Sequence, residues 1–292
     1  MRPLLIALAA AASTIAFTHI ASAADMPTKA PAYAPPPPAP VYSWTGFYVG
    51  GNVGYGWGSR TVNFTPNDLN VFASSCGGSF GSTCPPPASF DIDGALGGLQ
   101  AGYNWQFNQN WLVGIETDFN WSRIKGTGTD SFLILPGLPT GGPSNFVASQ
   151  NVEWFGTVRG RLGLLPTTNL LVYGTAGFAY GRVGENVALN SQPSANGTLA
   201  GFSFACLSGP NCFLGSSSRI ATGWTAGTGF EYAVSNNISV KGEYLFTSLG
   251  GDTINVVAVT PIPPSSPSSF TAAFNRTSFN VVRVGLDYKF GQ

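Results

Sequence analysis

From residue 45 onward, the chain alternates between apolar residues and polar or small ones in eight separate segments. In the first segment, Phe47, Val49 and Val53 share one face. Tyr48 and Asn52 lie on the other, because successive side chains of a β-strand point in opposite directions. The same pattern predicts strands over 46–57, 93–106, 111–122, 151–164, 170–182, 220–233, 238–249 and 276–290. Each predicted strand therefore has one apolar face and one polar face.

The connections between these segments alternate strictly in length. Three are short, at 107–110, 165–169 and 234–237, and four are long, at 58–92, 123–150, 183–219 and 250–275. Transmembrane β-barrels have short periplasmic turns and long extracellular loops, and an even strand number places both termini on the periplasmic side. We therefore expect an all-β fold, an eight-stranded antiparallel up-and-down transmembrane β-barrel with four long extracellular loops and short periplasmic turns.

The apolar faces of these strands are expected to face lipid and the polar faces to line the lumen. An Arg or Lys facing lipid at the membrane midplane would cost about 2–4 kcal/mol, whereas charges of both signs can pair inside a narrow barrel. The predicted lumen charge network consists of Glu116, Asp118, Glu153, Arg159, Arg161, Glu231, Lys241, Glu243, Arg283, Asp287 and Lys289. Its balance of signs favours a paired structural plug over an ion path or gate.

The seven tryptophans lie at or near the ends of predicted strands. Transmembrane barrels carry girdles of aromatic residues at both membrane interfaces. The predicted aromatic girdle consists of Trp44, Trp57, Trp105, Trp111, Trp121, Trp154 and Trp224, together with Tyr288 and Phe290 near the C-terminus.

The N-terminal region has the composition of an export signal. Arg2 precedes an apolar stretch over 4–17 and the small residues Ala21-Ser22-Ala23, a pattern typical of a cleaved secretory signal peptide over 1–23. Residues 24–43 include four consecutive prolines and predict an extended periplasmic linker, followed by the barrel over 44–292. No later apolar run reaches 18 residues, which argues against a helical membrane protein.

Composition argues against several classes of function. Only 9% of the residues are charged and the net charge is zero, which disfavours a nucleic-acid partner and a freely soluble cytosolic enzyme. The single histidine, His19, falls in the predicted signal peptide, so the mature chain would lack imidazole for acid–base catalysis, zinc or haem ligation. We predict no catalytic, cofactor-binding or metal site. The charges of the long connections, Arg60 and Glu185 among them, nearly balance and predict no strong electrostatic ligand.

The four cysteines, Cys76, Cys84, Cys206 and Cys212, lie in the first and third long connections. Export to an oxidising compartment favours disulfides, of which three connectivities are possible. Their proximity along the chain favours Cys76–Cys84 and Cys206–Cys212, which would shape loop tips.

Several stretches together carry a family resemblance. They are WTGFYVGGNVGY at 44–55, WFGTVRGRLG at 154–163, VYGTAG at 172–177 and GWTAGTGFEY at 223–232. They resemble the small immunogenic or porin-like outer-membrane proteins of Gram-negative bacteria, which belong with the OmpA-type eight-stranded barrels. The resemblance covers about 44–292 and implies an abundant surface antigen and envelope component.

Some members of that family are described as porins, as haem binders or as proteins linked to peptidoglycan through the mature N-terminus, which Ala24-Asp25 resembles. We therefore expect a monomeric barrel in contact with outer-membrane lipid, acting as a structural envelope component and surface antigen. A narrow passive porin for ions or small solutes and an adhesin acting through the loops are the alternatives. A filled lumen would favour the structural role, because small barrels leave little room for water.

Overall fold

The computed structural model describes residues 42–67, 87–133, 143–191, 197–199, 202–204, 211–259 and 269–290. The chain divides at residue 40, and the described residues all belong to the second unit, Val41–Gln292. The predicted signal peptide and nearly all of the predicted linker therefore lie outside the described residues. Within them, no helix is long and apolar enough to cross a membrane.

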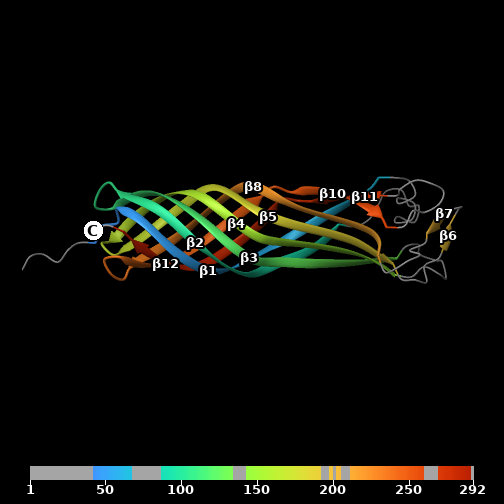
Figure 1. Cartoon of the computed structure of the whole chain (residues 1–292), viewed down its shortest axis with the longest axis horizontal. Coiled ribbons are helices and arrows are strands. Elements are labelled where there is room, and N and C mark those ends of the chain that lie inside the picture. Colours follow the sequence, from blue (N-terminus) through green and yellow to red (C-terminus); the bar gives the residue numbers. More distant parts are fainter. Residues whose placement is uncertain are drawn as a thin grey trace, which may run out of the picture. The chain divides into compact units, whose positions relative to one another are not determined.

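The described part is made of β-strands (Figure 1). They are β1 (Gly46–Pro66), β2 (Ala88–Gln106), β3 (Trp111–Leu133), β4 (Pro143–Thr167), β5 (Leu170–Ser191), β6 (Gly197–Leu199), β7 (Phe202–Phe204), β8 (Asn211–Ala233), β9 (Ile238–Leu249), β10 (Asp252–Ala258), β11 (Ser269–Phe274) and β12 (Thr277–Lys289).

Eight of these strands close into a ring. In the order β1, β2, β3, β4, β5, β8, β9 and β12, each pairs antiparallel with the next, and β12 pairs with β1. Strands β10 and β11 continue β9 and β12 beyond two-residue breaks, and β6 and β7 form a small separate hairpin. Figure 1 shows the ring as a closed wall, with β10 and β11 at the end away from the C-terminus. The predicted eight-stranded antiparallel barrel is confirmed.

Along the strands, the apolar residues change from the outer face of the wall to the inner face, and the polar residues change the opposite way. Near the short turns, apolar side chains point outward and polar ones inward, as the alternation predicts. Farther along β1, Val62 and Phe64 are buried inside, whereas Asn63 and Thr65 are exposed outside. Ile92 is likewise buried inside on β2, with Asp91 exposed outside. The period of two continues, but apolar and polar residues change places.

The predicted strands are too short for this reason. The first was expected to end at residue 57, but β1 runs for 21 residues and β4 for 25. Much of the predicted long connections 58–92, 123–150, 183–219 and 250–275 is strand. The predicted strands were bounded by their outward apolar face, so they end where the apolar residues turn inward.

The interior is filled at both ends by apolar residues. At the short-turn end, Trp44 is only 1% exposed and packs with Tyr42, Leu112 and Leu171. Its indole N–H donates to the Thr168 carbonyl at 3.0 Å. The prediction that Trp44 belongs to the aromatic girdle is wrong, because the chain before β1 folds under the barrel mouth and buries this ring.

At the other end, aromatic rings meet inside the barrel. The rings of Phe64 and Phe146 stack with their centroids 4.5 Å apart. Phe270 lies edge-on to Phe146 at 5.3 Å and contacts Phe213 at 5.6 Å. This aromatic layer belongs to a larger apolar cluster that fills the long-connection half of the barrel. The polar part of the lumen is thus enclosed between two apolar layers.

Candidate functional site

The charged middle of the lumen is the candidate functional site, and strand register builds it. Glu116 lies directly opposite Arg159 in the β3–β4 ladder. Arg283 lies opposite Glu243 between β12 and β9, and Glu231 lies opposite Lys241 between β8 and β9. Opposite charges at facing positions of neighbouring strands stabilise an antiparallel pair.

Glu116 is the centre of the network. Its Oε2 accepts hydrogen bonds from the Tyr48 hydroxyl at 2.7 Å and from Lys241 Nζ at 2.8 Å, and lies 3.3 Å from Arg161 Nη1. Its Oε1 pairs with Arg159 Nη2 at 2.5 Å and lies 3.6 Å from Arg283 Nη2. A single fully buried carboxylate thus contacts four cationic side chains from three different strands.

A second group of ion pairs surrounds Asp118 and Glu243. Asp118 Oδ2 accepts from Arg159 Nη2 at 2.9 Å and from Arg283 Nη2 at 3.0 Å. Glu243 Oε1 accepts from Arg159 Nη1 at 2.8 Å, and Glu243 Oε2 accepts from Arg283 Nε at 2.7 Å. These four side chains are fully shielded from solvent.

The remaining charges lie at the margin of this group. Arg161 Nη2 donates to Glu231 Oε2 at 2.8 Å, and its guanidinium lies 3.9 Å from the centroid of the Tyr173 ring. Asp287 Oδ1 accepts from Gln100 Nε2 at 2.5 Å. A buried charge is tolerated when it is paired and hydrogen-bonded, and each of these charges is.

The structure buries ten of the eleven predicted lumen charges inside the barrel. They are Glu116, Asp118, Arg159, Arg161, Glu231, Lys241, Glu243, Arg283, Asp287 and Lys289. Lys289 lies at the short-turn end, where it donates to the Ser43 carbonyl and covers the Tyr42 ring.

The prediction for Glu153 is wrong. Its side chain is 43% exposed on the outer wall, where it lies 3.4 Å from Arg182. The pairing of β4 with β5 shifts register between Val152 and Trp154. A bulge inserts one extra residue into a strand, so the alternation that correctly places Arg159 inside places Glu153 on the wrong face.

The neutral partners of the network were not among the residues predicted from the sequence. Tyr48, Thr157, Tyr173 and Gln100 are buried and hydrogen-bond to its carboxylates. Tyr48 lies on the polar face of its predicted strand, and this position could have predicted that its hydroxyl points into the lumen. Room for its ring comes from Gly102, where a Cβ would lie 2.4 Å from the Tyr48 hydroxyl.

The outer wall carries two aromatic belts separated by apolar residues. Trp105, Trp111, Tyr288 and Phe290 are exposed near the short turns, and Trp57, Trp121 and Trp224 are exposed at the far edge of the apolar band. Trp154, at the same edge, is half-buried with its ring 5.3 Å from that of Phe119.

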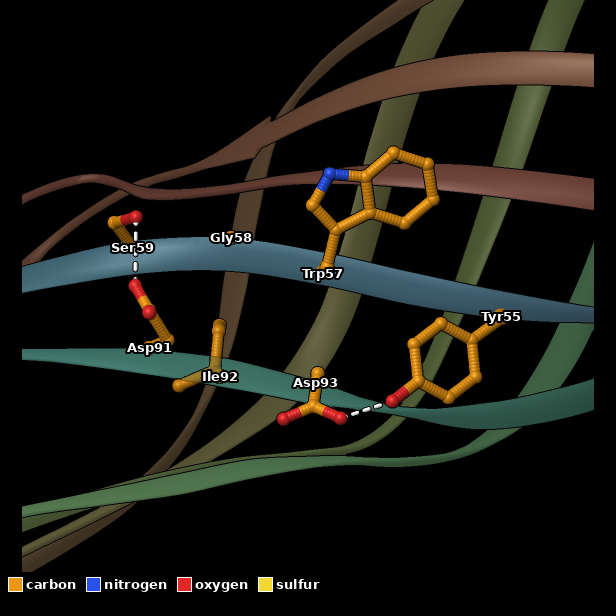
Figure 2. Close-up of a pocket in the computed structure, with 7 residues that line it drawn as sticks. All are labelled: Tyr55, Trp57, Gly58, Ser59, Asp91, Ile92 and Asp93. Atoms are coloured by element: carbon orange, nitrogen blue, oxygen red, sulfur yellow. Dashed lines mark hydrogen bonds between the residues drawn. The ribbon is translucent and has the colours of Figure 1, made fainter.

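Charged side chains appear on the outer wall beyond the second belt. Figure 2 shows Asp91 and Asp93 on β2, across from Tyr55 and Ser59 of β1. Together with Trp57, these residues line a hollow of about 410 Å³. Tyr55 donates to Asp93, and Ser59 donates to Asp91 Oδ1 at 2.9 Å. The apolar band therefore ends at this level.

A small polar group interrupts the apolar half of the interior. Glu185 and Arg60 were expected in loops but are buried there, at 1% and 3% exposure. Gln150 Nε2 donates to Glu185 Oε1 at 2.6 Å. Glu185 lies three residues beyond the exposed Arg182, outside the apolar band. Burial is the largest cause that raises the pKa of the Glu185 carboxyl, the hydrogen bond from Gln150 lowers it and Asp252 raises it, and together these effects give a pKa of about 7.

The remaining candidate residues are not placed by the described part of the structure. Ala24, Asp25, Cys76, Cys84 and Cys206 lie outside it, as does the side chain of Cys212. Among the residues that it does contain, no group of three or more His, Cys, Asp or Glu side chains is arranged to hold a metal ion.

The sequence model of the outer membrane protein beta-barrel domain family matches residues 7–290. The chain belongs to this outer-membrane barrel family. It is 36% identical to the "31 kDa outer-membrane immunogenic protein" of Brucella melitensis over 276 residues, covering 94% of this chain and 95% of that protein. It is 28% identical to the "25 kDa outer-membrane immunogenic protein" of Brucella abortus, covering 93% of this chain and 96% of the relative.

Among solved structures, the outer-membrane barrel OprG of Pseudomonas aeruginosa is similar at 12% identity and a TM-score of 0.42, covering 86% of this chain and 99% of that one. Membership of the family places the protein in the outer membrane. The apolar band between the two aromatic belts is then the surface that contacts lipid.

Replacing Glu116 by Gln should strongly destabilise this outer-membrane barrel. The substitution leaves buried cations without their counter-charge, and breaking a buried ion pair costs about 3–5 kcal/mol. The free energy of unfolding, measured by urea titration of protein inserted in lipid vesicles, should fall by this amount.

Glu153→Gln is the matched control, because it removes the same charge from an exposed pair worth at most about 1 kcal/mol. Equal losses for the two variants would contradict the assignment of Glu116 as the centre of the network.

Glu185 should make stability depend on pH. Between its ordinary pKa of 4.5 and its folded pKa of about 7, the unfolded chain is ionised while the folded protein keeps the proton. Stability therefore falls as pH rises through this window and changes little above it. Relative to Glu185→Gln, the wild-type protein should lose roughly 2–3 kcal/mol between these pH values. A stability difference between the two proteins that stays constant with pH would contradict the assignment.

Proposed function

We propose that this protein is a closed outer-membrane barrel that acts as a structural envelope component and surface antigen, without enzymatic activity. The observation that carries the proposal is the filled interior. Paired charges around Glu116 lie between the Trp44 layer at one end and the Phe64–Phe146 layer at the other. An eight-stranded barrel has an interior that side chains fill. This supports a structural role over a narrow passive porin.

The role as a surface antigen is supported by the relatives, two of which are named immunogenic outer-membrane proteins. Strands that extend beyond the lipid band would present the long connections to the outside as antibody epitopes. An adhesin would use the same surface. Disulfides Cys76–Cys84 and Cys206–Cys212 would then shape the tips of two of these loops.

We infer that the short turns face the periplasm and the long connections face outside, as is usual for outer-membrane barrels. After removal of the signal peptide over 1–23, the linker 24–43 would enter the barrel from the periplasm. Ala24 or Asp25 would then be able to join the barrel to peptidoglycan. The barrel would be a monomer whose partners are the lipids of the outer membrane.

Single cysteines at the two ends of the barrel test this orientation. Thr253→Cys lies at the long-connection end and Asn236→Cys in a short turn, and both positions are exposed. A membrane-impermeant maleimide should label Thr253→Cys in intact cells but not Asn236→Cys, because only the first position would face outside. Labelling is measured by mass spectrometry against the chain with its native cysteines alone.

Cells with a permeabilised outer membrane provide the control, in which both cysteines should react. Labelling of Asn236→Cys alone in intact cells would reverse the orientation. Absence of labelling at Thr253→Cys would contradict a surface antigen, as would failure of antibodies against the folded protein to bind intact cells.

A further inference from the structure

The backbone ladder of the barrel wall is interrupted between β8 and the β10–β11 hairpin. The β8–β9 ladder ends at Gly223 opposite Leu249. The next ladder pairs on this side join only Val257 and Ala258 of β10 to Leu214 and Phe213 of β8. Within the described strands, residues 215–221 of β8 therefore pair with β5 but have no ladder partner on the β10 side.

The opposite edge of the hairpin is also interrupted, but it is held more firmly. The β1–β12 ladder ends at Trp57 opposite Asn280, and pairing resumes between Val62 and Phe274. From there β11 pairs continuously with β1 as far as Pro66. The β8 edge, with its two pairs, is consequently the weaker attachment of the hairpin.

Arginine side chains bridge both interruptions. On the β8 side, Arg219 Nη2 donates to the Gly250 carbonyl at 2.6 Å, and its Nε lies 3.1 Å from Asp252 Oδ2. The Ser217 hydroxyl donates to the same Asp252 oxygen at 2.7 Å. On the β1 side, Arg60 donates to the carbonyls of Arg276 and Ser278. Side-chain bonds here take the place of a backbone ladder.

The hairpin has a hinge on each strand. The break between β9 and β10 at Gly250 and Gly251 lies beside the break between β11 and β12 at Asn275 and Arg276. A Cβ at Gly251 would lie 2.3 Å from the Phe274 carbonyl oxygen, so this close approach requires glycine.

The polar side chains that face inward at the weak edge are partly exposed. The inward-facing side chains of Arg219 and Asp252 are 28% and 23% exposed. Arg60 and Gln150, which also face inward in this half of the barrel, are 3% and 1% exposed. The interruption is thus a seam in the wall, latched by Arg219, Asp252 and Ser217.

The interior behind the seam is apolar except for the side chains of Glu185 and Gln150. Val187, Leu189, Phe213, Ile254 and Val256 line it. Glu185 lies opposite Ser217 in the β5–β8 ladder. Glu185 Oε2 and Gln150 Oε1 are buried and have no hydrogen-bond partner among the described residues. Buried polar atoms without a partner favour a ligand group that can form hydrogen bonds with them.

We propose that the β10–β11 hairpin is a flap that swings away from β8 and admits a small lipophilic molecule sideways into this interior. The hydroxyl or ammonium head of the ligand would meet Glu185 and Gln150, and its apolar part would lie among the surrounding aliphatic and aromatic residues. The charged network beneath still blocks passage along the barrel. The site is therefore a binding chamber with a lateral entrance, which goes beyond the closed structural barrel.

Cysteine labelling tests the flap in full-length protein inserted in lipid vesicles. Val187→Cys introduces a thiol at a position that is 1% exposed and lies opposite Gly215 at the seam. The lipophilic reagent N-(1-pyrenyl)maleimide should label it slowly, and about ten-fold faster when Asp252→Ala removes the latch, because local opening then loses a charged hydrogen bond. The chain without the added cysteine supplies the baseline.

Two controls separate flap opening from general loosening. Thr253→Ala changes the exposed neighbour of Asp252 and should leave the rate unchanged. Ala179→Cys is buried opposite Gly223, where β8 is still paired, and Asp252→Ala should not accelerate its labelling. An unchanged rate at Val187→Cys, or equal acceleration at both cysteines, would overturn the flap.

The chemistry of the ligand is tested with the same Val187→Cys protein. Pre-incubation with 1-dodecanol should slow labelling in a saturable way, and dodecane, which has no donor, should slow it less. A sulfonated maleimide should react more slowly than the pyrenyl reagent. Equal effects of the alcohol and the alkane would overturn the head-group contact, and faster reaction of the sulfonated reagent would overturn the preference for lipophilic molecules.

Discussion

A charged side chain inside an eight-stranded barrel has neither bulk water nor free space around it, so it must lie beside an opposite charge. This constraint determines much of the structure. Glu116 contacts four cations, and the pairs Glu116–Arg159 and Glu243–Arg283 require their strands to be in one register. A slip by one residue would turn these charges toward lipid and apolar residues into the lumen.

The surroundings of the wall impose the second constraint. Between the aromatic belts the wall faces lipid, so apolar residues point outward and polar ones inward. Beyond the second belt it faces water, and residues such as Val62, Phe64 and Phe146 turn inward to form an ordinary apolar core. The exchange lets the strands continue far past the membrane while the lumen remains closed. It also makes the interior behind the β8–β10 seam apolar.

The period-two pattern was sufficient to predict the strand order, the outward face and nearly all of the lumen charges. These features follow from local alternation, because once one residue of a regular strand is placed, the faces of all the others are known. Glu153 was misplaced because a bulge depends on how two strands meet, and Trp44 because a residue before the first strand has no alternation to follow. The long ends of the strands were missed because their apolar face changes sides.

The paired charges and the two apolar layers are expected to seal the lumen. Single-channel recording of the folded protein in planar lipid bilayers tests this seal most directly, with insertion verified by the change in gel mobility on heating. Inserted wild-type protein should give no conductance steps. Reproducible steps whose ion selectivity changes with Glu243→Lys would contradict the seal and would make the lumen a pore.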